Sequence, residues 1–121
     1  MDRKDELKNQ YYSDWNVDEK SVNKMAEDRK KEIKEESKSD RDFIKDESKN
    51  IRKEIKDDYK DYKKEMKESD DPYAREKISI AKQDMKDVRK DIKDDSKELR
   101  RDIKEEADQQ INNVERTTRD Y

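Results

Sequence analysis

The sequence contains no glycine, no cysteine and no histidine, and its only proline is Pro72. Glycine is the residue on which tight turns and β-bulges usually depend, so its absence favours uninterrupted helix. Without cysteine, no disulfide framework can form. Histidine, cysteine and a glycine-rich loop that holds phosphate, three of the most common elements of catalytic and ligand-binding sites, are thus missing. We therefore expect no catalytic, cofactor or metal site, and no enzyme.

Apolar residues are also scarce in this chain. Hydrophobic residues make up 26% of the sequence and charged residues 57%, whereas an ordinary globular domain has roughly 45–50% apolar and about 25% charged residues. A closed three-dimensional core needs more apolar surface than this. Two classes remain, namely a helical rod with one narrow apolar seam and a disordered polyampholyte.

No part of the sequence has the length and hydrophobicity of a membrane span, which takes about 18 apolar residues. The first residues, Met1–Glu6, lack the apolar segment of a signal peptide. We therefore expect a cytoplasmic protein. The 33 basic and 36 acidic residues nearly balance, whereas a dedicated nucleic-acid binder is strongly basic. Nucleic acid is accordingly not an expected partner.

An 11-residue repeat runs through most of the chain. Rows of eleven that start at Ile33 read IKEESKSDRDF, IKDESKNIRKE and IKDDYKDYKKE, and the register continues to the row LRRDIKEEADQ at Leu99. Eleven residues complete three helical turns, so this period keeps apolar residues in a straight or slightly right-handed stripe. The repeat predicts an all-α fold, a long coiled-coil-like helical rod.

The apolar stripe of the repeat is the predicted seam through which copies assemble. Its residues are Val22, Ile33, Ile44, Ile51, Ile55, Tyr59, Tyr62, Met66, Tyr73, Ala81, Met85, Val88, Ile92, Leu99, Ile103 and Val114. Ring packing between helices is the expected role of the tyrosines among them.

Charges of opposite sign lie on the two sides of this seam. The predicted basic flank includes Lys34, Lys45, Lys56, Lys60 and Lys64. The predicted acidic flank includes Glu54, Asp57, Asp58, Asp61 and Glu65.

These flanks predict how identical helices associate. When two such helices lie in parallel, the basic flank of one meets the acidic flank of the other, whereas an antiparallel pair brings like charges together. We therefore expect a parallel homo-oligomer, a structural protein that self-assembles into bundles or filaments.

The chain divides into an N-terminal arm of residues 1–15, which carries aromatic and charged residues, and a helical rod of residues 16–119 with a break or kink at 69–72. Asn16 is the predicted N-cap of the rod. A continuous helix is favoured because the register crosses Pro72 without an insertion, no glycine offers a tight turn, and folding back would bring like-charged flanks together. The alternative is a hairpin with helices over 16–68 and 72–118, since Asp70 or Asp71 before a proline is a common helix start.

In its period the chain resembles several groups of 11-residue-repeat helical proteins, although no family-specific motif or functional residue carries over. These groups are late-embryogenesis-abundant proteins, apolipoprotein-like and perilipin-like lipid-surface helices, and right-handed coiled coils. The resemblance implies two alternatives to self-assembly, an amphipathic lipid-surface helix and a hydrophilic stress protectant. Docking on a different protein partner is also compatible with the sequence.

Overall fold

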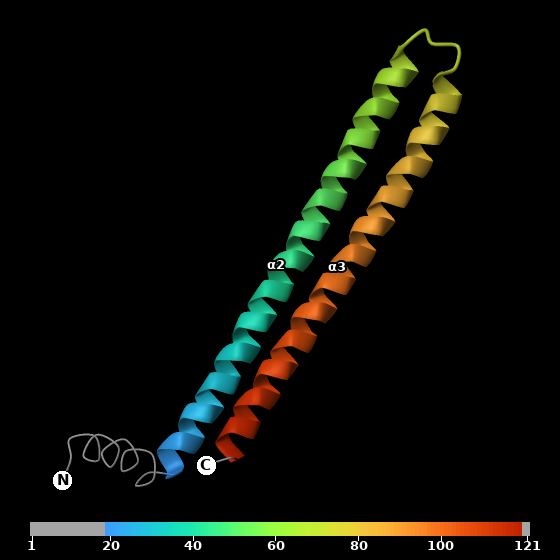
Figure 1. Ribbon diagram of the computed structural model, residues 1–121. Helices are drawn as coiled ribbons and strands as arrows, with labels where there is room; N and C mark the ends of the chain where they lie inside the picture. The colour runs from blue at the N-terminus through green and yellow to red at the C-terminus, as the bar shows by residue number, and fades with distance from the viewer. Residues whose placement is uncertain (1–18, 120–121) are drawn as a thin grey trace, which may run out of the picture. The chain divides into compact units, whose positions relative to one another are not determined.

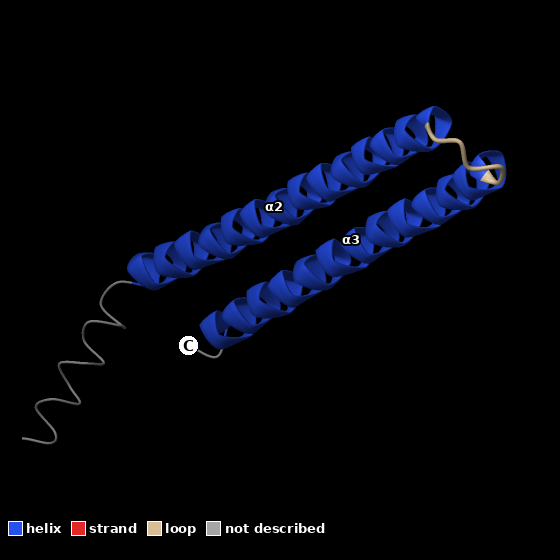
Figure 2. Cartoon of the chain, turned by 90° about the horizontal axis from the view of Figure 1, so that it is seen from above, coloured by secondary structure: helices blue, strands red, loops and turns tan. Residues whose placement is uncertain are grey.

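The computed structural model describes residues 19–119, and these form two long helices (Figure 1). Helix α2 spans Glu19–Glu68 and helix α3 spans Ala74–Arg119. Helix accounts for 95% of the described residues, and no strand occurs among them (Figure 2). The predicted all-α fold is therefore confirmed. The predicted arm of residues 1–15 and the N-cap at Asn16 lie outside the described residues.

Both helices follow from local sequence. Neither contains glycine or proline, and lysine, glutamate and arginine, which favour helix, are abundant in both. Each helix also has an acidic residue in its first turn and a basic residue in its last, where these charges oppose the partial charges of the helix ends. Long helices therefore form despite the small number of apolar residues.

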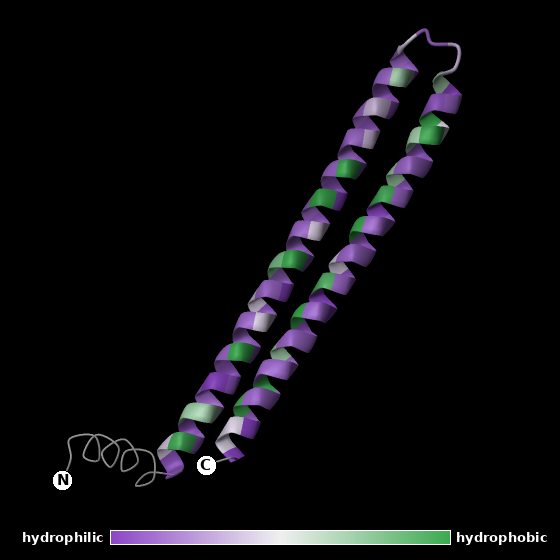
Figure 3. Ribbon diagram, in the orientation of Figure 1, coloured by the Kyte–Doolittle hydropathy of each residue, from purple (hydrophilic) through white to green (hydrophobic). Residues whose placement is uncertain are grey.

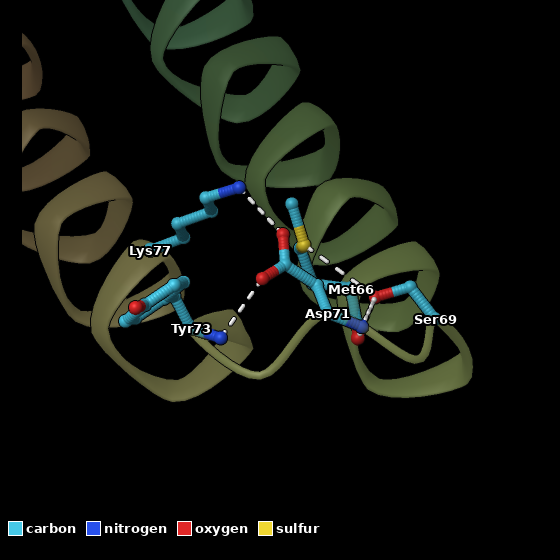
Figure 4. Close-up of polar contacts among 5 residues, drawn as sticks. All are labelled: Met66, Ser69, Asp71, Tyr73 and Lys77. Carbon is cyan, nitrogen blue, oxygen red and sulfur yellow. Dashed lines mark hydrogen bonds and ion pairs between the residues drawn. The ribbon is translucent and has the colours of Figure 1, made fainter.

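The continuous helix predicted across Pro72 is wrong, and the alternative, a hairpin that turns at Asp70–Pro72, is confirmed. Figure 4 shows how polar side chains make this turn. The Ser69 hydroxyl donates a hydrogen bond of 2.7 Å to the Met66 carbonyl at the end of α2. Asp71 then accepts a bond of 2.8 Å from the Tyr73 amide, as an N-cap does.

Glycine is not needed here because no described residue has a positive φ angle. Pro72, which has no amide hydrogen, occupies the first position after the cap, where that hydrogen would have no helical partner. The prediction of a continuous helix rested partly on the absence of glycine. It gave too little weight to a cap and a proline that together end one helix and start another.

An ion pair further fixes the start of α3. Asp71 pairs with Lys77, one turn into the helix. The hydrogen bond from Lys77, together with that from the Tyr73 amide, lowers the pKa of Asp71 below its usual value. The same contact raises the pKa of Lys77. The Asp71 carboxylate therefore has two tasks, as cap and as counter-ion, and both favour the charged form.

The described chain falls into two compact units. One consists of residues 19–38 of α2 with 105–119 of α3, and the other of residues 39–104. Residues 39–104 form a hairpin in which the end of α2 and the beginning of α3 run antiparallel about the turn. Apolar burial is sparse, since Ile33 and Ala107 are the buried apolar residues and no large side chain in the described part is fully buried.

The antiparallel arrangement of residues 39–104 contradicts the expectation that like charges would keep the two helices from folding back on each other. An exposed ion pair or a like-charged pair changes stability by only about 1 kcal/mol or less. Such small repulsions are outweighed here by the turn, which holds the two segments close together in one chain.

Candidate interaction surfaces

Burial defines which helical positions of residues 39–104 face the other helix. These inward positions are buried or half-buried, and they recur in steps of four, four and three residues. In α2 they are Arg41, Ile44, Ser48, Arg52, Ile55, Tyr59, Lys63 and Met66, and Tyr62, beside Lys63, is half-buried as well but lies outside this series. In α3 they are Ala74, Ile78, Ala81, Met85, Arg89, Ile92, Ser96, Arg100 and Ile103.

Small and basic residues occupy many inward positions. Ser48 and Ser96 are among the most buried residues of the chain, at 6% and 5% exposure. One turn further along each helix, an arginine bonds back to the serine carbonyl, Arg52 at 3.2 Å and Arg100 at 3.1 Å from its Nε atom. These bonds hold the arginine stems against the helix contact while the charged ends reach water. Each of these serines therefore lies between a half-buried isoleucine and a half-buried arginine in the inward series.

The residue that follows an inward position is almost always basic. In α2 these residues are Lys45, Lys49, Lys53, Lys56, Lys60, Lys64 and Lys67. In α3 they are Arg75, Lys82, Lys86, Lys90, Lys93, Lys97, Arg101 and Lys104. All are exposed, and among residues 39–104 the exceptions to the pattern are Asp42 and Ser79. We call this set the basic face.

The residue that precedes an inward position is acidic or apolar. The acidic residues are Asp40, Glu47, Glu54, Asp58 and Glu65 in α2, and Asp84, Asp91, Asp95 and Asp102 in α3. The exposed apolar residues of the helices within 39–104 are Phe43, Ile51, Ile80, Val88 and Leu99, which we call the apolar row. The acidic residues and the apolar row together form the acidic face. Lys77 is its one basic residue within 39–104, and it pairs with Asp71.

Helix geometry places the two faces on opposite sides of the hairpin. Successive residues lie about 100° apart around an α-helix, so the neighbours of an inward residue lie on either side of the helix contact. Two antiparallel helices are related by a two-fold axis perpendicular to the plane that contains them. Rotation about this axis exchanges the helices, but a residue above the plane stays above it. The basic residues of both helices therefore share one side, and the acidic residues share the other.

The unit of residues 19–38 and 105–119 is held by apolar and ionic contacts. Ile33 is 3% exposed, the lowest value for any large apolar side chain in the described part. Lys30 lies 2.6 Å from Glu27 in its own helix and 3.5 Å from Glu115 in α3. The hydrogen bond to Glu27, followed by the charges of both carboxylates, raises the pKa of Lys30. A shallow hollow opens beside this lysine, lined by Ala26 and Thr118 among others.

The structure places most residues of the predicted seam at buried or half-buried positions. Four of them are exposed, namely Ile51, Tyr73, Val88 and Leu99. The predicted basic flank, Lys34, Lys45, Lys56, Lys60 and Lys64, is exposed throughout, and each of these lysines follows a buried or half-buried residue. Of the predicted acidic flank, Glu54, Asp58 and Glu65 belong to the acidic face, whereas Asp57 and Asp61 point outward, away from the helix contact.

The sequence interpretation missed the inward arginines. Arg41 and Arg52 in α2, and Arg89 and Arg100 in α3, are half-buried beside isoleucines. None of the four is among the residues of the predicted seam, because arginine is rarely buried. Their eleven-residue spacing, the same as that of the isoleucines, is the signal that would have identified them. Figure 3 shows helices that are mainly hydrophilic with separate apolar bands.

No group of three or more histidine, cysteine, aspartate or glutamate side chains in residues 19–119 is placed to hold a metal ion. Neither described helix contains a segment that is long and apolar enough to cross a membrane.

Comparison with known proteins identifies no relative. No family model matches the chain, and no curated protein or solved structure matches it either.

Proposed function

We propose that the chain is a non-enzymatic structural protein that assembles with further copies of itself. The observation that carries this proposal is the apolar row, whose side chains stay exposed although the helices are paired. Leu99 is 53% exposed and Phe43 is 65% exposed. Single exposed apolar residues are common, but an aligned set with a polar border is typical of an interaction surface. A further copy that covers this row completes the burial that one hairpin leaves unfinished.

The alternative of a lipid-surface helix fits this arrangement less well. Helices that lie on membranes carry lysine and arginine beside their apolar residues, where they meet anionic headgroups. Here the apolar row is bordered by carboxylates, and the lysines lie on the opposite side of the hairpin. The alternative of a stress protectant without stable structure would require these helices to form only on drying or crowding. Self-assembly makes use of both faces and therefore remains the leading proposal.

Serine at three positions of the apolar row tests the proposal. The variant Ile51→Ser, Val88→Ser, Leu99→Ser is expected to raise the dissociation constant for self-association by about tenfold or more, because each buried aliphatic side chain stabilises by about 1.5–3 kcal/mol when fully covered. Sedimentation velocity over a concentration series measures the change.

The matched control replaces the outward residues Asn50 and Gln83 with serine, and it should associate like the unmodified chain. Equal association of the triple variant and the unmodified chain would contradict the proposed role of the apolar row. A single-chain mass for the unmodified protein at every concentration would contradict self-assembly itself.

A further inference from the structure

We propose that copies stack with the basic face of one hairpin on the acidic face of the next, in parallel. This inference rests on the proposed self-assembly and specifies the surfaces that meet. It concerns residues 39–104, where both faces are defined. A second copy is translated perpendicular to the plane of the two helices, without rotation. Its α2 then lies on the neighbour's α2 and its α3 on the neighbour's α3.

The two faces match in spacing as well as in sign. On the basic face of α2, the lysines that follow isoleucine, serine, tyrosine or methionine are Lys45, Lys49, Lys56, Lys60 and Lys67, with alternating gaps of four and seven residues. On its acidic face, Glu47, Glu54, Asp58 and Glu65 have the same alternating gaps. At 1.5 Å per residue the pattern repeats every ~16 Å along both faces. A register that pairs charges at one point therefore pairs them along the whole contact.

Helix α3 repeats this match. On its basic face, the lysines that follow alanine, methionine, isoleucine or serine are Lys82, Lys86, Lys93, Lys97 and Lys104. On its acidic face are Asp84, Asp91, Asp95 and Asp102, and both sets have the same alternation of four and seven. A polyanion of arbitrary structure would have no reason to share this period. The acidic face of a second copy has the same period, because both faces come from the same repeat. A second copy is therefore the partner that the spacing favours.

Lysine chemistry explains how the basic face covers the apolar row. A lysine side chain has a four-carbon stem that packs on apolar surface while its ammonium group stays near water or a carboxylate. Stems from one copy then lie on Ile51, Val88 and Leu99 of the next. Their ammonium groups reach the carboxylates that border the row. The same contact thus covers the apolar row and pairs the carboxylates of the acidic face with lysines.

Like faces are expected to avoid each other. Two acidic faces would bring together only carboxylates and apolar residues, since Lys77 is already paired with Asp71. Two basic faces would bring together lysines and arginines alone. The favoured contact joins two different surfaces, and such a head-to-tail contact leaves a free face at each end. Assembly is therefore expected to be open-ended, with stacks that lengthen as protein concentration rises and shorten as salt rises.

Charge reversal of one face at a time tests this pairing. The basic-face variant carries Lys45→Glu, Lys56→Glu and Lys93→Glu. The acidic-face variant carries Glu54→Lys, Asp58→Lys and Asp95→Lys. Each variant alone presents reduced complementarity, and we expect its self-association to weaken by about tenfold or more at low salt. An equimolar mixture should associate again, because the reversed faces complement each other.

A third variant with outward substitutions, Asp57→Lys, Asp61→Lys and Asp94→Lys, controls for net charge. It makes the same number of changes of the same sign as the acidic-face variant, away from both faces, and it should still associate. Circular dichroism checks that all variants stay helical, and sedimentation velocity in about 50 and 500 mM salt measures association. Binding of anionic vesicles by the unmodified chain is measured alongside.

Each outcome decides between defined alternatives. Weak association of both face variants, recovery on mixing and an unaffected outward control would support the stacking proposal. Undiminished association of the face variants would overturn the proposed pairing and leave self-assembly through the apolar row intact. Equal weakening of the outward control would assign the effect to net charge and overturn it too. An unmodified chain that stays monomeric but binds anionic vesicles would overturn both the pairing and self-assembly, and would indicate that the basic face binds anionic lipid.

Discussion

Replacing Ile33 with alanine is expected to lower the free energy of unfolding by about 2–5 kcal/mol, the range typical of a buried isoleucine truncated to alanine. Ile33 is 3% exposed, and no other large apolar side chain in the described part is as deeply buried. The helices have few such contacts, so the loss of one is a large share of their apolar stabilisation. Urea unfolding followed by circular dichroism measures the change from the shift in midpoint at constant slope.

The control for this prediction is a larger side chain on the same helix. Phe43 is the only phenylalanine of the sequence, yet it is 65% exposed. In dilute solution, Phe43→Ala should change the free energy of unfolding by about 0.5 kcal/mol or less, because surface substitutions usually stay within that range. An equal or larger effect of Phe43→Ala than of Ile33→Ala would show that the helices pair in a different rotational setting.

The double variant Ser48→Ala, Ser96→Ala is expected to stabilise the protein, by about 1–3 kcal/mol. Both serines are buried, and their hydroxyl oxygens have no hydrogen-bond partner. A buried hydroxyl without a partner is unfavourable, and alanine also has the highest helix propensity. Alanine keeps the small size that lets the helices approach each other. Thermal unfolding should therefore show a higher midpoint for the variant.

An exposed serine separates the two contributions. Ser79→Ala in α3 gains only helix propensity, about 0.5 kcal/mol, because Ser79 is exposed. The gain per serine at Ser48 and Ser96 should exceed that value. A lower midpoint for the double variant would show that both hydroxyls are engaged in hydrogen bonds, and the proposed packing of small residues at the helix contact would need revision.

The helices themselves were predictable from the sequence because their cause is local. A long helix does not need many alanines when glycine and proline are absent over long stretches and charged residues that favour helix dominate. The turn was partly predictable, since Asp71 and Pro72 gave the signature of a helix start. The direction of the chain after the turn was not, because it depends on many weak contacts between segments that lie far apart in sequence.

The inward positions of the two helices differ in a way that the repeat did not predict. Ile44 and Ile55 are half-buried in α2, whereas Val88 and Leu99, in the same register of eleven, are exposed in α3. The break at residues 69–73 separates the helices, so that α3 presents a neighbouring stripe that includes Ile92 and other residues. Periodicity predicts which residues share a face within one helix, but the rotation of each helix about its axis is set by pairing.

The charged flanks were visible in the sequence, but their assignment to two sides of a hairpin was not. The same lysines that would line one flank of a single helix lie beside those of the second helix once the chain turns back. Lys56 in α2 and Lys93 in α3 thus belong to one basic face. The flanks of the two helices lie side by side because the helices pair antiparallel, an arrangement that the flank charges alone would disfavour. Two narrow flanks of the same sign thus form one broad face.

Small-angle X-ray scattering of the unmodified protein tests the central claim, self-association through charged faces, most directly. The mass from forward scattering is measured over a concentration series at low and at high salt. Our account predicts a mass above that of one 14.8 kDa chain, which rises with concentration at low salt and falls towards one chain at high salt. A mass of one chain at every concentration and both salt conditions would contradict it.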